Sequence, residues 1–100
     1  MGQTFTPAFT PLDQRIHAAI SGQASACFDL GVAYSCGCDG VAVDLIAAHK
    51  WFNLAALSGD QRGQKLRAEI AGEMTARDIA EAQRQARAWI ATHHPLPQAA

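Results

Sequence analysis

The residues of this chain best suited to chemistry are its three cysteines and one of its histidines. Cys36 and Cys38 flank a single glycine, Cys27 lies upstream of the pair, and His49 lies downstream. Thiolates joined by an imidazole suit zinc, which usually takes four such ligands. However, the gaps between these cysteines do not match the paired two-residue gaps of common structural zinc sites. We therefore predict no metal and no cofactor, with Cys27, Cys36, Cys38 and His49 as the only candidate ligands.

The cysteines also bear on redox chemistry. An odd number of cysteines argues against a disulfide framework, and the segment from Met1 to Thr10 lacks the basic and apolar runs of a secretory signal. A disulfide between Cys36 and Cys38 would close a very small ring. We expect reduced thiols in a cytoplasmic protein, and a thiol-based metal or redox sensor is an alternative function.

Other catalytic patterns are missing from the sequence. It has no Ser/His/Asp set, no paired acids on one helix face and no glycine-rich phosphate loop, so we predict that the chain is not an enzyme. His49 falls on the inner side of its helix, where we expect a partly buried, hydrogen-bonded imidazole. His93 and His94 precede a proline, where a helix C-terminus favours positive charge.

The composition narrows the possible partners. Hydrophobic residues make up 49% of the chain and charged residues 17%, which is typical of a packed globule and not of a disordered segment. The formal net charge is −1, so there is no general positive field to attract nucleic acid. No apolar run is long enough to suggest a membrane span. We therefore expect neither nucleic acid nor a membrane as a partner.

The apolar residues recur at helical spacing, and no stretch alternates as a strand does. Thr10 and Pro11 form a typical helix start, and several glycines mark helix ends. Gly31, inside a helix, indicates a close helix crossing. We predict an all-α fold of one domain, residues 1–100, with loose tails at 1–9 and 95–100. The expected helices cover about 11–21, 24–36, 44–59, 60–72 and 75–94.

Two of these helices and the turn between them carry a pattern of small and aromatic residues. The pattern consists of Ala26, Leu30–Gly31, Tyr34, Gly37, Gly40–Val41, Asp44, Ala48, Trp51–Phe52, Ala55–Ala56 and Gly59. The segment 24–59 resembles one Sel-one-like repeat, a branch of the tetratricopeptide-like helical repeats. The turn departs from the family pattern, since Cys38 and Asp39 both lie between its glycines where one residue is usual. No second repeat follows.

The resemblance implies antiparallel helix hairpins and an adaptor or scaffold role for a protein or peptide partner, without a catalytic centre. One hairpin cannot bury both of its apolar faces, and about three units are normally needed. We expect the first helix and the helices in 60–94 to act as caps, and a homo-oligomer is the alternative. Trp51, Phe52 and Tyr34 are expected in the core and not in an aromatic cage. A small structural subunit of a larger assembly is a further alternative function.

One side of the third helix is apolar where the repeat is usually polar. Ile46, Leu54 and Leu57 form this stripe. Either the last helix folds back over it, which we favour, or it is exposed and binds a partner or a second copy. The candidate partner-binding residues on this side are Ile46, Lys50, Asn53, Leu54 and Leu57.

Overall fold

The structure is a computed structural model that describes residues 10–93, and these form five α-helices without a strand. The prediction of an all-α fold is confirmed. The predicted tails 1–9 and 95–100, together with His94, lie outside the described residues. The helices are α1 (Pro11–Ile20), α2 (Ala24–Cys36), α3 (Leu45–Leu57), α4 (Gln61–Ala71) and α5 (Ala76–His93).

The helix starts follow from side chains that accept hydrogen bonds from free backbone N–H groups. At α1, the Asp13 N–H donates to the Thr10 hydroxyl and the Thr10 N–H donates to the Asp13 carboxylate, which is a complete capping box. Asp44 accepts from the Ala47 N–H at α3, and Thr75 accepts from an N–H of α5. Polar residues just before each apolar stripe therefore set where these helices begin.

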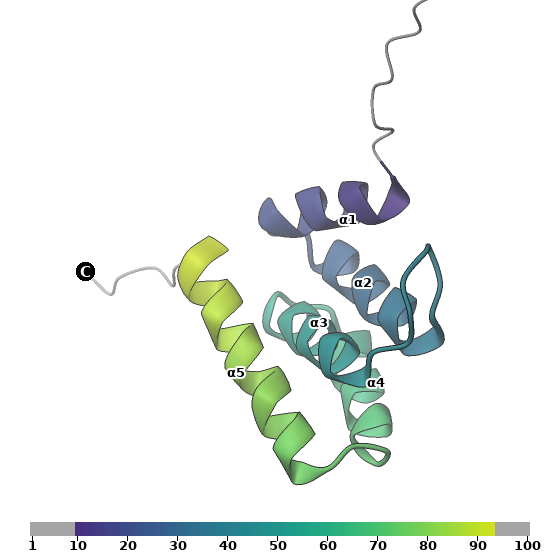
Figure 1. Cartoon of the computed structure of the whole chain (residues 1–100). Coiled ribbons are helices and arrows are strands. Elements are labelled where there is room, and N and C mark those ends of the chain that lie inside the picture. The colour runs from purple at the N-terminus through teal and green to yellow at the C-terminus, as the bar shows by residue number, and fades with distance from the viewer. Residues whose placement is uncertain (1–9, 94–100) are drawn as a thin grey trace, which may run out of the picture.

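Helix α3 is the centre of the molecule. It packs against α2, α4 and α5, whereas α1 packs on α2 (Figure 1). Leu30 of α2 and Trp51 of α3 are 0% and 4% exposed and belong to the same core cluster, as the hairpin interpretation requires. The two flanking segments thus both pack against the α2–α3 hairpin.

Two glycines on neighbouring helices let those helices approach α3 closely at Phe52, one at its ring and the other at its backbone. A Cβ atom on Gly31 of α2 would lie 2.4 Å from Cδ1 of Phe52, and one on Gly63 of α4 would lie 2.5 Å from the Phe52 carbonyl oxygen. Only a residue without a side chain fits at either place. Phe52 is 1% exposed, so the predicted close crossing at Gly31 is confirmed and a second one occurs at Gly63.

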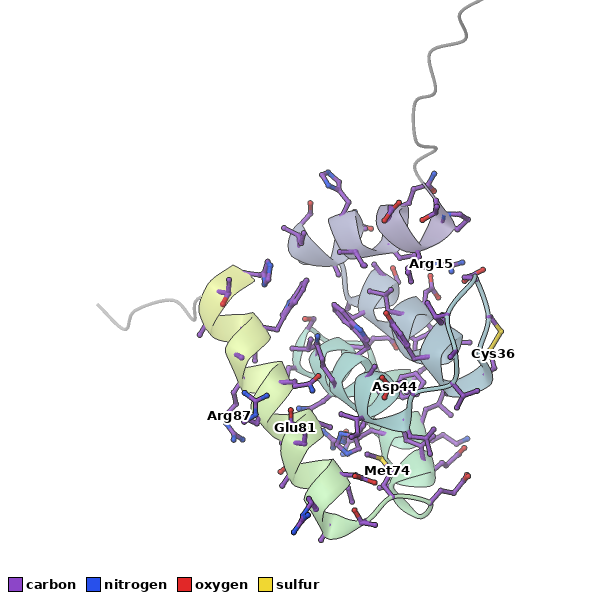
Figure 2. The ribbon with its side chains drawn as sticks, viewed as in Figure 1. Arg15, Cys36, Asp44, Met74, Glu81 and Arg87 are labelled. Carbon is purple, nitrogen blue, oxygen red and sulfur yellow. A yellow bond between two sulfur atoms is a disulfide. The ribbon has the colours of Figure 1, made fainter. Side chains whose placement is uncertain are left out.

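The turn between α2 and α3 is built from left-handed residues. Gly37, Asp39 and Gly40 all have positive φ angles, and the Asp44 N–H donates to the Tyr34 carbonyl at 2.9 Å to close the loop. Asp39 forms an ion pair with Arg15, so the loop also contacts α1. Figure 2 shows Arg15 next to the tip of this loop. The extra residue of the turn therefore connects the hairpin to the first cap.

Helix α5 covers the side of α3 that the repeat pattern would leave polar. Ala82 and Ala86 are 0% and 1% exposed and let the two helices approach closely. Above them the Trp89 ring packs edge-on against Trp51, with 4.7 Å between ring centroids. Helix α5 thus supplies part of the expected internal cover of α3.

Candidate functional site

The structure does not bring the candidate thiols together. Cys36 and Cys38 form a disulfide, and Figure 2 shows it at the edge of the molecule, away from the core. The expectation of reduced thiols is therefore wrong for this pair. The reason is local: Gly37 adopts a left-handed turn that sets the two Cα atoms 5.6 Å apart, a separation usual for disulfides.

Cys27 is free and buried at 3% exposure. Burial raises the pKa of its thiol to about 11, because a thiolate loses hydration in this apolar setting, and a backbone hydrogen bond offsets only part of the effect. Within residues 10–93, no three His, Cys, Asp or Glu side chains gather in a way that could hold a metal ion. The proposed cluster of Cys27, Cys36, Cys38 and His49 does not form there.

His49 differs from its expectation in one respect. Its side chain is buried, at 3% exposure, but Nδ1 has no hydrogen-bond partner among the described residues. Burial, with a smaller contribution from the Arg67 charge, lowers the pKa of the imidazole. The ring therefore fills space in its neutral form, as an aliphatic residue would, and has no arrangement that suits acid–base work.

The candidate partner-binding residues are divided among different environments. Leu54 is 4% exposed and belongs to the core, whereas Leu57 is 65% exposed. Ile46 is half-buried, and Asn53 accepts a hydrogen bond from Arg67 of α4. Lys50 lies over the rings of two tryptophans. The apolar stripe is thus neither wholly covered nor wholly exposed, because α5 diverges from α3 near Leu57.

An apolar cavity of about 260 Å³ opens where α5 diverges from α3. Its apolar lining comes from four helices, and Ser58 adds a hydroxyl. Figure 1 shows that the C-terminal ends of α1 and α5 lie on the same side of the molecule. The apolar lining residues are Ala19, Cys27, Leu54, Leu57, Trp89 and Ile90.

A second recess, of about 350 Å³, adjoins the same tryptophan on its polar side. Trp89 stacks on His93 with 3.7 Å between ring centroids, and the Lys50 ammonium lies 5.4 Å from the Trp89 centroid and 4.6 Å from that of Trp51. Arg84, Gln85, Ala88 and Thr92 complete the lining. This recess carries positive charge beside an aromatic wall.

Sequence reasoning missed the part that α5 plays in both cavities. Trp89 and Ile90 of α5 are each only half-buried, so this helix leaves part of its apolar face accessible. The available signal was Leu57, an apolar residue in the last turn of α3 at a position that the repeat usually leaves polar. The contribution of Ala19 from α1 had no signal in the sequence, because it depends on the angle at which that helix crosses α2.

Comparison with known proteins finds no matching family model, no matching curated protein and no matching solved structure. The resemblance to a Sel-one-like repeat thus remains a prediction based on the residues of α2 and α3. Among the helices between residues 10 and 93, none combines the length and the apolar character needed to cross a bilayer.

Proposed function

We propose that this chain is a non-catalytic protein-interaction module that takes an apolar side chain of a partner into the cavity beside Leu57. The observation that carries the proposal is the 65% exposure of Leu57 at the edge of a cavity whose lining is apolar apart from Ser58. Exposed apolar surface next to a concave site is characteristic of sites that bind another molecule. The resemblance to helical-repeat adaptors supports the same role.

The size of the cavity favours a side chain over a whole small-molecule ligand. Sites that enclose drug-sized ligands usually span about 300–1,000 Å³. A cavity of about 150 Å³ already takes a benzene ring, so one of about 260 Å³ accommodates a leucine, phenylalanine or methionine side chain. Such buried anchors often dominate the binding energy of an interface.

Photo-crosslinking in the native host tests this proposal. A photoreactive phenylalanine analogue replaces Leu57 in one protein and exposed Gln64 of α4 in a matched control. We expect position 57 to yield a covalent adduct with one partner protein, identified by mass spectrometry, and position 64 to yield none. Equal labelling from both positions, no adduct, or an adduct only with a second copy of the chain contradicts the proposal.

The proposal places the module in the cytoplasm, with the hairpin of α2 and α3 as a single Sel-one-like unit. In its favour, α1 and α5 lie against this hairpin as terminal caps do in repeat proteins. Ala82 and Ala86 of α5 are buried and the arginines at 77, 84 and 87 are exposed, which is the two-sided character expected of a cap.

A second candidate function is a redox response of the Cys36–Cys38 disulfide. Both residues are exposed, and cytoplasmic disulfides are usually transient or redox-sensing. A dithiol reductant would transfer two electrons and two protons to the pair, leaving two thiols on the protein and a disulfide on the reductant.

Alkylation trapping tests the redox candidate. Cells are quenched in acid before and after oxidant treatment, and the peptide holding residues 36 and 38 is analysed by mass spectrometry. We expect oxidant treatment to raise the fraction of the protein in which the pair forms the disulfide. A pair that stays in one state under both conditions contradicts a redox response.

A further inference from the structure

We propose that the recess around Lys50 binds a carboxylate of the same peptide whose apolar side chain enters the cavity beside Leu57. This inference rests on the proposed function, and it specifies the chemistry of the partner: an apolar residue followed by Asp, Glu or a chain terminus.

Lys50 is a charged side chain in an unusual position. Its ammonium lies over two tryptophan rings, 4.6 and 5.4 Å from their centroids, and its side chain is half-buried. No acidic group forms an ion pair with it in the part of the chain that the structure describes. Buried charges in proteins are normally paired. Lys50 therefore lacks the anion that such a position calls for.

The electrostatics of the site support this interpretation. Burial lowers the pKa of Lys50, and the more distant charge of Asp44 only partly compensates. A bound carboxylate would favour the charged ammonium and offset its lost hydration. Cation–π contact with the two rings holds the ammonium in place but does not neutralise it.

The acid on the adjoining helix is already engaged. Glu81 accepts hydrogen bonds from Arg84 at 2.6 and 2.9 Å and from Gln85 at 2.9 Å. Its carboxylate is thus satisfied within α5 and forms no ion pair with Lys50. Arg84 lines the recess with its charge balanced by Glu81, and His93 adds an imidazole stacked on Trp89. Lys50 is therefore the cation of the recess that has no ion-pair partner among the described residues, and it is the group that would attract an anion.

Trp89 joins the two sites. It lines both the apolar cavity and the recess around Lys50, so the two sites are separated by about the width of one side chain. A short peptide whose backbone bends over Trp89 can reach both at once, because such a bend can direct two neighbouring side chains to the same surface. An apolar side chain would take the cavity, and the carboxylate of the next residue would approach Lys50.

Two capped dipeptides test the inference: N-acetyl-leucyl-glutamate amide and N-acetyl-leucyl-glutamine amide. Binding to the full chain is followed by NMR through the two indole N–H signals and the backbone signals of Leu57 and His93. We expect both peptides to shift Leu57, and the glutamate peptide to bind about fivefold tighter, as a partly exposed ion pair allows. The difference should shrink in high salt.

Variants test whether Lys50 causes the difference in affinity between the glutamate and glutamine peptides. Lys50→Met keeps an unbranched apolar stem over the rings and should abolish the preference for glutamate, whereas Lys50→Arg should keep it. Lys65→Met, at an exposed position of α4, is the matched control and should leave the preference unchanged. Far-UV circular dichroism checks that each variant is folded.

The outcomes separate this inference from the proposed function. Equal binding of the two peptides overturns the carboxylate site and leaves the apolar site standing. If the Lys50→Met variant still binds the glutamate peptide more tightly, the carboxylate site at Lys50 is also overturned, because another group would then recognise the carboxylate. If neither peptide shifts Leu57 or Trp89, the apolar site and the carboxylate site are both refuted.

Discussion

Gly31 lies directly against the ring of Phe52, and a Cβ atom at this position would be 2.4 Å from the nearest ring carbon. The ring itself is 1% exposed and cannot swing into solvent without opening the core. This contact sets how closely α2 approaches α3, and it therefore sets the geometry of the hairpin on which both caps rest.

We predict that Gly31→Ala lowers the free energy of unfolding by about 2 kcal/mol, because overpacking of the core outweighs the better helix propensity of alanine. Gly72→Ala is the matched control. Its φ is −63° and its Cβ would meet only the Glu69 carbonyl oxygen at 3.5 Å, so stability should stay equal or rise slightly. Urea denaturation measures both. A Gly31→Ala protein as stable as the parent would show that the two helices can separate freely.

Leu54 and Leu57 should respond in opposite ways to truncation. Leu54→Ala removes a side chain that is 4% exposed and should cost about 3 kcal/mol, whereas Leu57→Ala, at 65% exposure, should change stability by less than about 0.5 kcal/mol. Thermal unfolding followed by circular dichroism gives both values. A large loss at Leu57 would mean that this residue belongs to the core and is not available to a partner.

His49→Leu should not destabilise the protein at pH 7 and should raise its urea midpoint, since the buried Nδ1 has no partner and its desolvation costs about 1–3 kcal/mol. The lowered pKa has a defined consequence. Above pH 6.5 the imidazole is neutral in both states, but below it the unfolded chain takes up a proton first, so stability falls as the pH drops towards the folded pKa.

The pH dependence of stability in His49→Leu and in the parent protein tests whether the buried imidazole is responsible. The loss of stability on acidification from pH 7 to pH 5 should be smaller in His49→Leu than in the parent, measured by urea midpoints at each pH. Identical slopes in the two proteins would show that His49 is hydrated or paired in solution, contrary to the structure.

Cys27 should be slow to react. With a pKa of about 11 its thiolate fraction at pH 8 is about one in a thousand, so alkylation by iodoacetamide should be at least about 100-fold slower than for an exposed cysteine. The Cys36→Ser/Cys38→Ser double variant leaves Cys27 as the only thiol, and mass spectrometry follows its modification. Denaturing urea should restore ordinary reactivity, and fast labelling of the folded protein would argue against a buried thiol.

The raised pKa of Cys27 also makes the free energy of unfolding fall at alkaline pH. The folded state keeps the Cys27 proton, whereas the unfolded thiol ionises near its ordinary value of 9.0. The contribution of Cys27 to the free energy of unfolding is therefore complete below pH 9 and declines as the pH rises towards 11. In a Cys27→Ala variant this component of the decline should be missing.

Much of the fold was predictable because its signals are local. The caps at Thr10 and Asp44 begin helices where the sequence places them, and the periodic apolar residues define which face is buried. Gly31 could be interpreted as a close crossing because glycine inside a helix has a cost that only tight packing offsets. These inferences need only residues a few positions apart.

The candidate site was less predictable because it depends on angles between helices. Nothing in the sequence indicates how far α5 diverges from α3, so the division between buried Leu54 and exposed Leu57 could not be foreseen. Likewise, the turn at Gly37 that brings Cys36 and Cys38 together is a matter of backbone conformation and not of spacing. Lys50 was chosen for its place on α3, but its two aromatic neighbours come from different helices.

The order of packing along the chain has a consequence for folding speed. Helices α2, α3 and α4 are consecutive, and each packs on the next, so their contacts close only short loops, and domains dominated by such contacts fold within microseconds to milliseconds. Helix α5 is the exception, because it passes over α4 in sequence to reach α3. During synthesis on the ribosome, the side of α3 around Trp51 would stay unshielded until Trp89 has left the exit tunnel.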